Sequence, residues 1–168
     1  RGEKHPDPLI AAKKVTSYGA DSVTIHLRED RRHINDLDAK RICSIKKLLV
    51  NLEVSTNPKI IKTALKIKPN FICIVPENRR EITTEGGLNL RINKNKIKKI
   101  IKKFKKKKIR TSIFINPTLN DIKISKELKA DCIELHTGNL ANLVKAKKNF
   151  SKELYRIKKF KKIIKKKL

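Results

Sequence analysis

Hydrophobic and polar residues alternate in several short segments of the chain, and a segment with helical spacing follows each of them. The clearest case is 22–27, where Val23, Ile25 and Leu27 alternate with polar residues, as in a half-buried strand. Further strands are predicted at 48–53, 71–75, 110–115 and 132–136. The segment 71–75 is apolar throughout, which is typical of a strand buried on both faces of a parallel sheet.

Helices are predicted between the strands, at 8–18, 35–47, 58–67, 93–107 and 119–129, with a last helix from Ser151 to the end of the chain. Asp7 and Asn57 precede helices as candidate caps, and Gly19 is expected to end the first helix. Leu9, Ala12 and Val15 are expected to share one face of that helix. A strand followed by a helix, repeated along the chain, predicts an α/β fold with a parallel sheet.

The unusual polar residues of the chain gather where the predicted strands end. They are His26, Arg28, Glu53, Glu77, Asn116, Glu134 and His136. In a TIM (β/α)8 barrel these strand ends form the catalytic face, and the chain has neither the Gly-rich turn of a Rossmann sheet nor a P-loop. We therefore predict that residues 1–168 form a single incomplete TIM-barrel domain, with about five strands present and the first and last strands missing.

The strand at 22–27 runs into five consecutive charged residues and a histidine, at 28–33. Guanidinium groups bind phosphate oxygens in a planar, bidentate manner, and an imidazole can move protons near neutral pH, so the segment suits a phosphorylated substrate. The alternative is an ordinary solvated loop. Glu53 has a similar alternative as a solvated strand end. The long polar segment 76–88 is a candidate lid.

Composition adds a strong positive charge, because the formal net charge is +28. Most of the excess lies at 94–108 and 158–167, where apolar residues recur at helical spacing and the lysines fall on the opposite, solvated faces. The apolar positions are Ile97, Ile100, Ile101 and Phe104 in the first segment, and Leu154, Ile157, Ile164 and Leu168 in the second. Without interleaved aromatic residues for base stacking, these faces do not favour a nucleic-acid-binding role.

Other features exclude further classes of protein. The three cysteines have no paired metal-ligand spacing and are expected to be reduced, buried thiols. No apolar run of membrane-spanning length and no signal peptide is present, which favours a cytoplasmic protein without a membrane partner. Because methionine is absent, we expect the sequence to begin inside a longer or processed product.

Several motifs occur in an order that identifies a family. HLREDRRHI, NLE, VPE followed by TTEGGL, and IELHTG, with RG and PDP near the N-terminus, resemble the pyridoxine 5'-phosphate synthase family of the deoxyxylulose-dependent vitamin B6 pathway. The resemblance implies a TIM barrel that condenses 3-amino-2-oxopropyl phosphate with 1-deoxy-D-xylulose 5-phosphate, releasing phosphate and water. It also implies a homo-octamer that needs no metal or redox cofactor.

The resemblance assigns roles to individual residues of this chain. His26 and Glu53 are similar to the family's acid/base pair, and Glu134 to the carboxylate that stabilises the transition state. Arg28, His33 and Thr83 are similar to contacts of the deoxyxylulose phosphate, and Arg1 to a contact of the aminoketone phosphate. The motifs give no specific role to Arg31 and Arg32, which are expected to be solvated or intersubunit residues, and a structural role is favoured for His136.

The chain also departs from the family pattern. The first strand, with an Asn-x-Asp-His motif, and the last two strands, with a Gly-His-Gly segment and the expected proton-donor histidine, are absent. This chain by itself is therefore expected to be inactive and poorly folded. The alternatives to a working synthase are an inactive remnant of that enzyme and a basic nucleic-acid-binding protein, whose binding would weaken steeply with salt.

Overall fold

A computed structural model of the chain describes residues 6–77 and 86–167. Within these ranges strands and helices alternate, and the chain ends with two successive helices. In chain order the elements are α1 (Pro8–Ser17), β1 (Val23–His26), α2 (Asp36–Cys43), β2 (Val50–Val54), α3 (Pro58–Ile67), β3 (Phe71–Ile74), α4 (Leu90–Lys106), β4 (Arg110–Ile115), α5 (Leu119–Glu127), β5 (Cys132–Leu135), α6 (Gly138–Lys145) and α7 (Ser151–Lys167).

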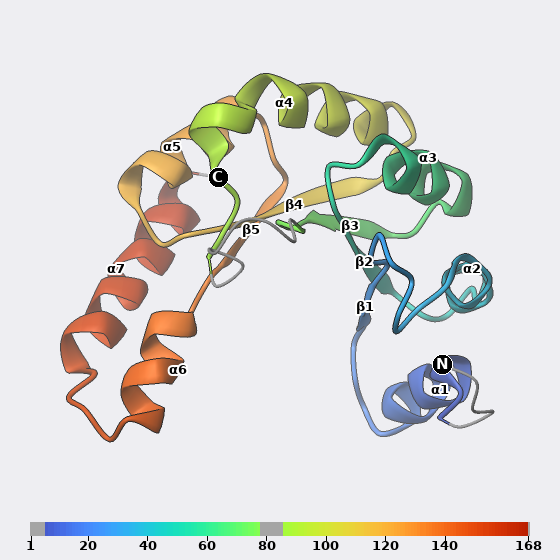
Figure 1. Cartoon of the computed structure of the whole chain (residues 1–168), viewed down its shortest axis with the longest axis horizontal. Coiled ribbons are helices and arrows are strands. Elements are labelled where there is room, and N and C mark those ends of the chain that lie inside the picture. Colours follow the sequence, from blue (N-terminus) through green and yellow to red (C-terminus); the bar gives the residue numbers. More distant parts are fainter. Residues whose placement is uncertain (1–5, 78–85, 168) are drawn as a thin grey trace.

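The five described strands form one parallel sheet in the order β1-β2-β3-β4-β5. A doubly wound sheet reverses its strand order at a switch point, whereas a TIM barrel adds each new strand beside the previous one. The consecutive order, with helices between the strands, confirms the predicted α/β fold and is consistent with a TIM barrel. Figure 1 shows the helices α1 to α5 arranged in an arc around the outside of the curved sheet.

The hydrophobic core lies between the sheet and this arc of helices. Along β2, Val50, Leu52 and Val54 are fully buried, while the alternate residues Asn51 and Glu53 point to the other face and are only half-buried. The same alternation in β1 places His26 on the face of Glu53. The residues that fill the core are therefore separated, strand by strand, from the polar residues that line the opposite face.

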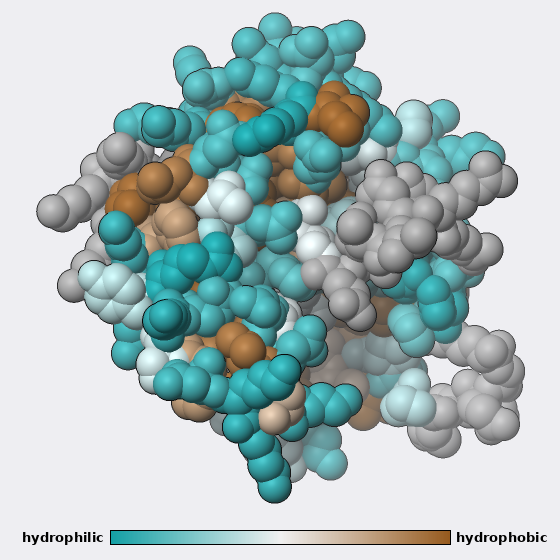
Figure 2. All heavy atoms as spheres, turned by 60° about the vertical axis from the view of Figure 1, so that its left-hand side comes forward, coloured by the Kyte–Doolittle hydropathy of each residue, from teal (hydrophilic) through white to brown (hydrophobic). Residues whose placement is uncertain are grey.

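Helix α4 confirms the predicted apolar stripe, since Ile97, Ile100, Ile101 and Phe104 are all buried. Its lysines lie mainly on the exposed side of the helix. Figure 2 shows one face of the molecule covered mostly by hydrophilic residues, with small, separated hydrophobic areas. Among the helices of the described residues, none is both long and apolar enough to cross a membrane.

Some predictions about individual helices were wrong. Helix α6 was not predicted, and none of its residues is buried. Val15 was expected to share one face of α1 with Ala12, but Ala12 is buried and Val15 is exposed. In α7 the buried apolar residue is Phe160, whereas the predicted stripe residues Leu154, Ile157 and Ile164 are only half-buried and Leu168 lies outside the described residues.

The predictions for caps and cysteines had different outcomes. The side chains of Asp7 and Asn57 accept hydrogen bonds from backbone N–H groups of the following helices, as predicted. All three cysteines are free thiols, but Cys73 alone is buried, and Cys43 and Cys132 are half-buried. The expectation of three buried thiols was therefore wrong for two of them.

Gly87 lies where the backbone of the segment before α4 contacts the end of β4. Its N–H donates to Asn116 Oδ1 at 2.9 Å, and a Cβ atom at Gly87 would lie 2.3 Å from the backbone of Ile115 and Asn116. We expect Gly87→Ala to lower the free energy of unfolding by about 1–3 kcal/mol, because backbone atoms would have to move. Gly138→Ala is the control, to be compared in urea unfolding.

A Cβ at Gly138 would instead meet the side chain of His136, at 2.6 Å, and a side chain can rotate away more easily than a strand can shift. We therefore expect the smaller loss at Gly138. A loss at Gly87 no larger than that at Gly138 would contradict the close backbone contact.

Candidate active site at the carboxyl ends of the strands

The centre of the site is a histidine paired with a carboxylate on the neighbouring strand. His26, the last residue of β1, is in register with Glu53 of β2, and parallel pairing places both side chains on the same face. His26 Nδ1 lies 3.5 Å from Glu53 Oε2. Their side chains are 24% and 28% exposed, so both remain accessible to a small molecule. The two residues assigned to acid/base chemistry are thus brought together.

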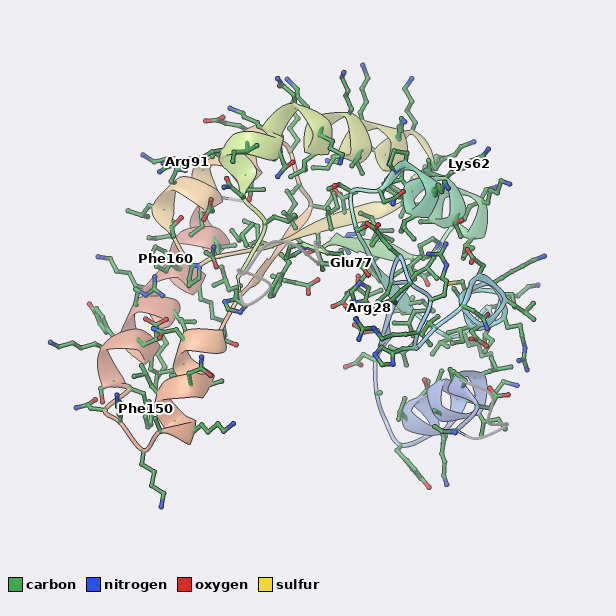
Figure 3. All side chains as sticks on the ribbon, in the orientation of Figure 1. Arg28, Lys62, Glu77, Arg91, Phe150 and Phe160 are labelled. Atoms are coloured by element: carbon green, nitrogen blue, oxygen red, sulfur yellow. The ribbon has the colours of Figure 1, made fainter. Side chains whose placement is uncertain are left out.

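A second carboxylate approaches the same histidine from β3. Glu77 follows the end of that strand, and its Oε2 lies 3.7 Å from His26 Nε2. Its Oε1 lies 3.6 Å from Arg28 Nε, and Arg28 also pairs with Asp30. In Figure 3, Arg28 and Glu77 lie near each other on the inner side of the arc. The imidazole of His26 is therefore flanked by a carboxylate at each ring nitrogen.

The charged segment after β1 is held by specific contacts, which does not support the alternative of an ordinary solvated loop. The carboxylate of Glu29 accepts hydrogen bonds from Ser55 Oγ at 2.7 Å and from Asn57 Nδ2 at 2.9 Å. The guanidinium of Arg31 donates to the carbonyl of Arg28 and to the carboxylate of Asp36. Side chains on both sides of the segment thus fix the position of Arg28.

Glu134 reaches the same face from β5. Its Oε1 accepts a hydrogen bond of 3.4 Å from Asn51 Nδ2, across a sequence separation of 83 residues. Its charge also raises the pKa of Glu53, after the larger effect of burial. Glu134 therefore lies close enough to Glu53 for the two carboxylates to affect each other, as a shared site requires.

Burial and neighbouring charges set the protonation of the central pair. Burial is the main cause that lowers the pKa of His26 from 6.5 to about 4, with further contributions from the neighbouring Arg28 and His33 and an opposing effect of Asp30. Burial and Glu134 raise the pKa of Glu53. The imidazole is therefore neutral at neutral pH, and the carboxyl group more readily takes up a proton. A base beside an acid of raised pKa is the arrangement that proton transfer needs.

This shift predicts how stability depends on pH. The pKa of His26 is lower in the folded chain than in the unfolded chain, so between about pH 4 and pH 6.5 the unfolded chain binds more protons. The contribution of His26 is fully present above pH 6.5 and is lost as the pH falls toward 4. The raised pKa of Glu53 acts in the opposite direction, because that carboxyl binds its proton more readily in the folded chain.

We expect the free energy of unfolding to fall between pH 7 and pH 5, and to fall less in His26→Asn than in the original chain. Urea unfolding of both proteins at the two pH values measures the difference. An equal loss in both would show that His26 takes up its proton equally in the folded and unfolded states.

The remaining predicted residues are placed less centrally or lie outside the described residues. His33 is exposed, and it is near enough to affect the pKa of His26. Arg1 and Thr83 lie outside the described residues, as does most of the candidate lid. His136 packs edge-to-face against Phe114, with ring centroids 5.5 Å apart, which agrees with a structural role.

A pocket of about 510 Å³ lies beside these strand ends, between the ends of β4 and β5 and the helices α6 and α7. Its lining includes Asn116, His136, Asn139, Asn142 and Arg156. Arg156 is already held there, because it pairs with Glu153 and donates a hydrogen bond of 2.8 Å to the carbonyl of Pro117. This arginine therefore ties α7 to the end of β4.

Two residues of the site were not assigned a role from the sequence. Glu77 was noted only as a polar residue after a strand, and Asn51 was not singled out. The position of Glu77 shortly after an apolar parallel strand could have indicated that it belongs to the site, because a carboxylate near a buried strand needs a polar partner. Asn51 lies in the middle of β2, and its position on the face of Glu53 follows from the alternation of that strand.

Comparison with known proteins adds an independent finding. The family model described as "Pyridoxal phosphate biosynthesis protein PdxJ" matches residues 1–167. A protein of Pelagibacter ubique named pyridoxine 5'-phosphate synthase is 62% identical over 159 residues, which cover 95% of this chain and 66% of that protein. Proteins of the same name from Thermodesulfovibrio yellowstonii and Nautilia profundicola are 50% and 51% identical, over 79% and 82% of this chain and 55% and 53% of their own lengths. The chain thus spans between about half and two thirds of these curated relatives.

Proposed function

Because the chain belongs to the PdxJ family of pyridoxal phosphate biosynthesis proteins, we propose that it is the central part of a pyridoxine 5'-phosphate synthase. Its substrates would be 3-amino-2-oxopropyl phosphate and 1-deoxy-D-xylulose 5-phosphate, and its products pyridoxine 5'-phosphate, phosphate and water. The observation that carries the proposal is the pair His26 and Glu53 at adjacent strand ends, 3.5 Å apart, with Arg28 nearby.

The chemistry of ring closure fits these side chains. The amine of one substrate attacks a ketone of the other, the adduct loses water to form an imine, and protons then leave and return at neighbouring carbons as the ring closes. Each step needs a group that accepts a proton and a group that gives one near neutral pH. A neutral imidazole beside a carboxyl of raised pKa supports both roles, and the pair can exchange its proton between steps.

Binding of the phosphates is supported by the charged segment after β1. Arg28 pairs with Asp30 and with Glu77 through its Nε atom. A guanidinium group binds phosphate in a bidentate manner, and a position fixed by two carboxylates reduces the entropy lost on binding. We propose Arg28 and His33 as contacts of the deoxyxylulose phosphate. Thr83, Arg1 and the stabilising role of Glu134 complete the proposed site.

The extent and assembly of the protein are also proposals. We propose that residues 1–168 belong to a single TIM-barrel domain, and that the protein acts in the cytoplasm as a homo-octamer without a metal or redox cofactor. Family membership supports the barrel and the reaction. It does not favour a nucleic-acid-binding protein, and the lysine-rich face of α4 is explained by the solvated side of a helix whose other side is buried.

The test begins with the coding sequence that flanks this segment, because the curated relatives are longer than the chain. We expect an Asn-x-Asp-His strand upstream and a Gly-His-Gly segment downstream. The product that includes them, incubated with the two phosphates, should release inorganic phosphate and form pyridoxine 5'-phosphate in equal amounts. A folded product with both motifs that makes neither compound would refute the proposed activity.

A further inference from the structure

Glu77 is a nearly buried carboxylate that contacts three residues at and after the end of β1. Its side chain is 8% exposed. One oxygen, Oε1, accepts the backbone N–H of Glu29 at 2.9 Å and lies 3.6 Å from Arg28 Nε. The other oxygen, Oε2, lies 3.7 Å from His26 Nε2. The end of β3 is thereby joined to both the catalytic histidine and the arginine next to it.

The closest atoms of Glu77 and His26 are an oxygen and a nitrogen, and no other group among the described residues forms a hydrogen bond with either of them. Neither Glu77 Oε2 nor His26 Nε2 has a hydrogen-bond partner there, and both atoms are buried. Leaving a buried polar atom without a partner costs about 1–3 kcal/mol. The distance of 3.7 Å is longer than a hydrogen bond, but the two atoms attract each other if the imidazole carries its proton on Nε2, since an ionised carboxylate only accepts hydrogen bonds.

The two carboxylates that flank His26 have different surroundings. Glu77 accepts a backbone N–H and faces the guanidinium of Arg28, and both contacts favour its ionised form, whereas burial is the larger effect and raises its pKa, together with the charges of Glu29 and Asp30. Burial, and after it the like charge of Glu134, raise the pKa of Glu53. The two carboxylates differ in exposure: the side chain of Glu53 is 28% exposed, so water can hydrate it, whereas Glu77 Oε2 is buried and has no hydrogen-bond partner among the described residues. The proton of a neutral imidazole is therefore attracted to the side of Glu77, and the unprotonated nitrogen is left facing Glu53.

We propose that Glu77 is a positioning residue that holds the proton of neutral His26 on Nε2 and presents the unprotonated Nδ1 as the base beside Glu53. The role in catalysis rests on the synthase function proposed above, whereas the position of the proton does not. During turnover Nδ1 takes one proton, and the imidazolium so formed is stabilised by the anionic Glu77. The same proton then passes to Glu53 or to the substrate, and His26 returns to its neutral form.

A purely structural role of Glu77 predicts something different. The carboxylate of Glu29 also fixes the segment after β1, through Ser55 and Asn57, but it has no contact with the ring of His26 among the described residues. Glu29→Gln is therefore the matched control for Glu77→Gln, because each removes one of the carboxylate charges that hold the segment after β1. A structural role would make the two variants equivalent at the ring of His26.

The experiment is NMR spectroscopy of the full chain with 15N-labelled histidine at neutral pH. The chain has four histidines, and the signal of His26 is identified by its loss in His26→Asn. In the original chain we expect Nε2 to be the protonated nitrogen. In Glu77→Gln the ratio of the Nε2-protonated to the Nδ1-protonated form should fall roughly tenfold or more, which corresponds to one pKa unit. In Glu29→Gln the ratio should stay within about twofold of the original.

Each outcome decides the proposal. A ring protonated mainly on Nδ1 in the original chain would overturn it, and this result needs no variant, so it holds even if Glu77→Gln does not fold. A folded Glu77→Gln with an unchanged ratio would overturn it as well. If the ratio changes as expected but the product with its flanking sequence has no synthase activity, the proposed function fails and the positioning of the proton stands.

Kinetics provide the second measurement if that product is active. There, Glu77→Gln should lower kcat by roughly tenfold or more, within the range of general acid–base effects. An unchanged kcat would remove the catalytic role of Glu77.

Discussion

Replacing His26 with Asn should reduce the formation of pyridoxine 5'-phosphate by about 10²–10⁴-fold, the usual contribution of a general acid–base group. Asparagine is similar in size and still forms hydrogen bonds, but it cannot take up and release a proton near neutral pH. The loss should be in kcat, because His26 contacts Glu53 and Glu77 at the strand ends and is not the proposed phosphate ligand. Steady-state release of phosphate, measured on the product that includes the flanking coding sequence, gives this value.

His136→Asn is the matched control for this variant. The substitution is the same and also lies at the carboxyl end of a strand, directly after β5, but the ring of His136 packs against Phe114. We expect its turnover to stay within a few-fold of the original, with at most a modest loss of stability. Near-normal turnover of His26→Asn would refute the catalytic role of His26, and equal losses in both variants would point to a general disturbance of the strand ends.

The largest expected effect on stability comes from Phe104→Ala, which should lower the free energy of unfolding by about 3–5 kcal/mol. Phe104 is fully buried, near the end of α4, the helix that contacts β4 and α5. Truncation would remove its apolar surface from the core and leave a cavity that the surrounding residues fill only in part. Urea unfolding measures the change.

Lys103→Ala, on the exposed side of the same helix, is the control for this prediction. We expect it to change the free energy of unfolding by no more than about 0.5 kcal/mol, as is usual for surface positions. A loss below 1 kcal/mol in Phe104→Ala would contradict the packing of α4 against the sheet. Comparable losses in both variants would indicate that helix formation in α4, and not burial, limits stability.

Local sequence patterns were enough to predict most of the elements. The strand predicted at 110–115 has the same bounds in the structure, and β1 to β3 agree with their predictions within two residues at either end. These segments alternate or are continuously apolar because one or both faces are buried, so burial leaves its pattern directly in the sequence. Helix α6 was missed for the converse reason, since it has no buried residue and its cap residue Thr137 makes no side-chain cap hydrogen bond.

The candidate site was predictable in its residue types but not in its contacts. Strand ends carrying His26, Glu53 and Glu134 could be read from the sequence, because the carboxyl ends of parallel strands meet at one edge. The motifs also indicated the family. The apolar stripe of α1 was misplaced at Val15, because which side of a short helix is covered depends on neighbouring elements.

The sequence by itself determined the alternation of strands and helices, the polar ends of the strands, and the family of the chain, because each is encoded within a few consecutive residues. Only the tertiary structure decided which carboxylate faces which nitrogen of His26, and that Glu77 belongs to the site. Glu77 accepts the N–H of a residue 48 positions away, and Asn51 binds Glu134 across 83 positions. Such pairings depend on how neighbouring strands align, and no local pattern records that alignment.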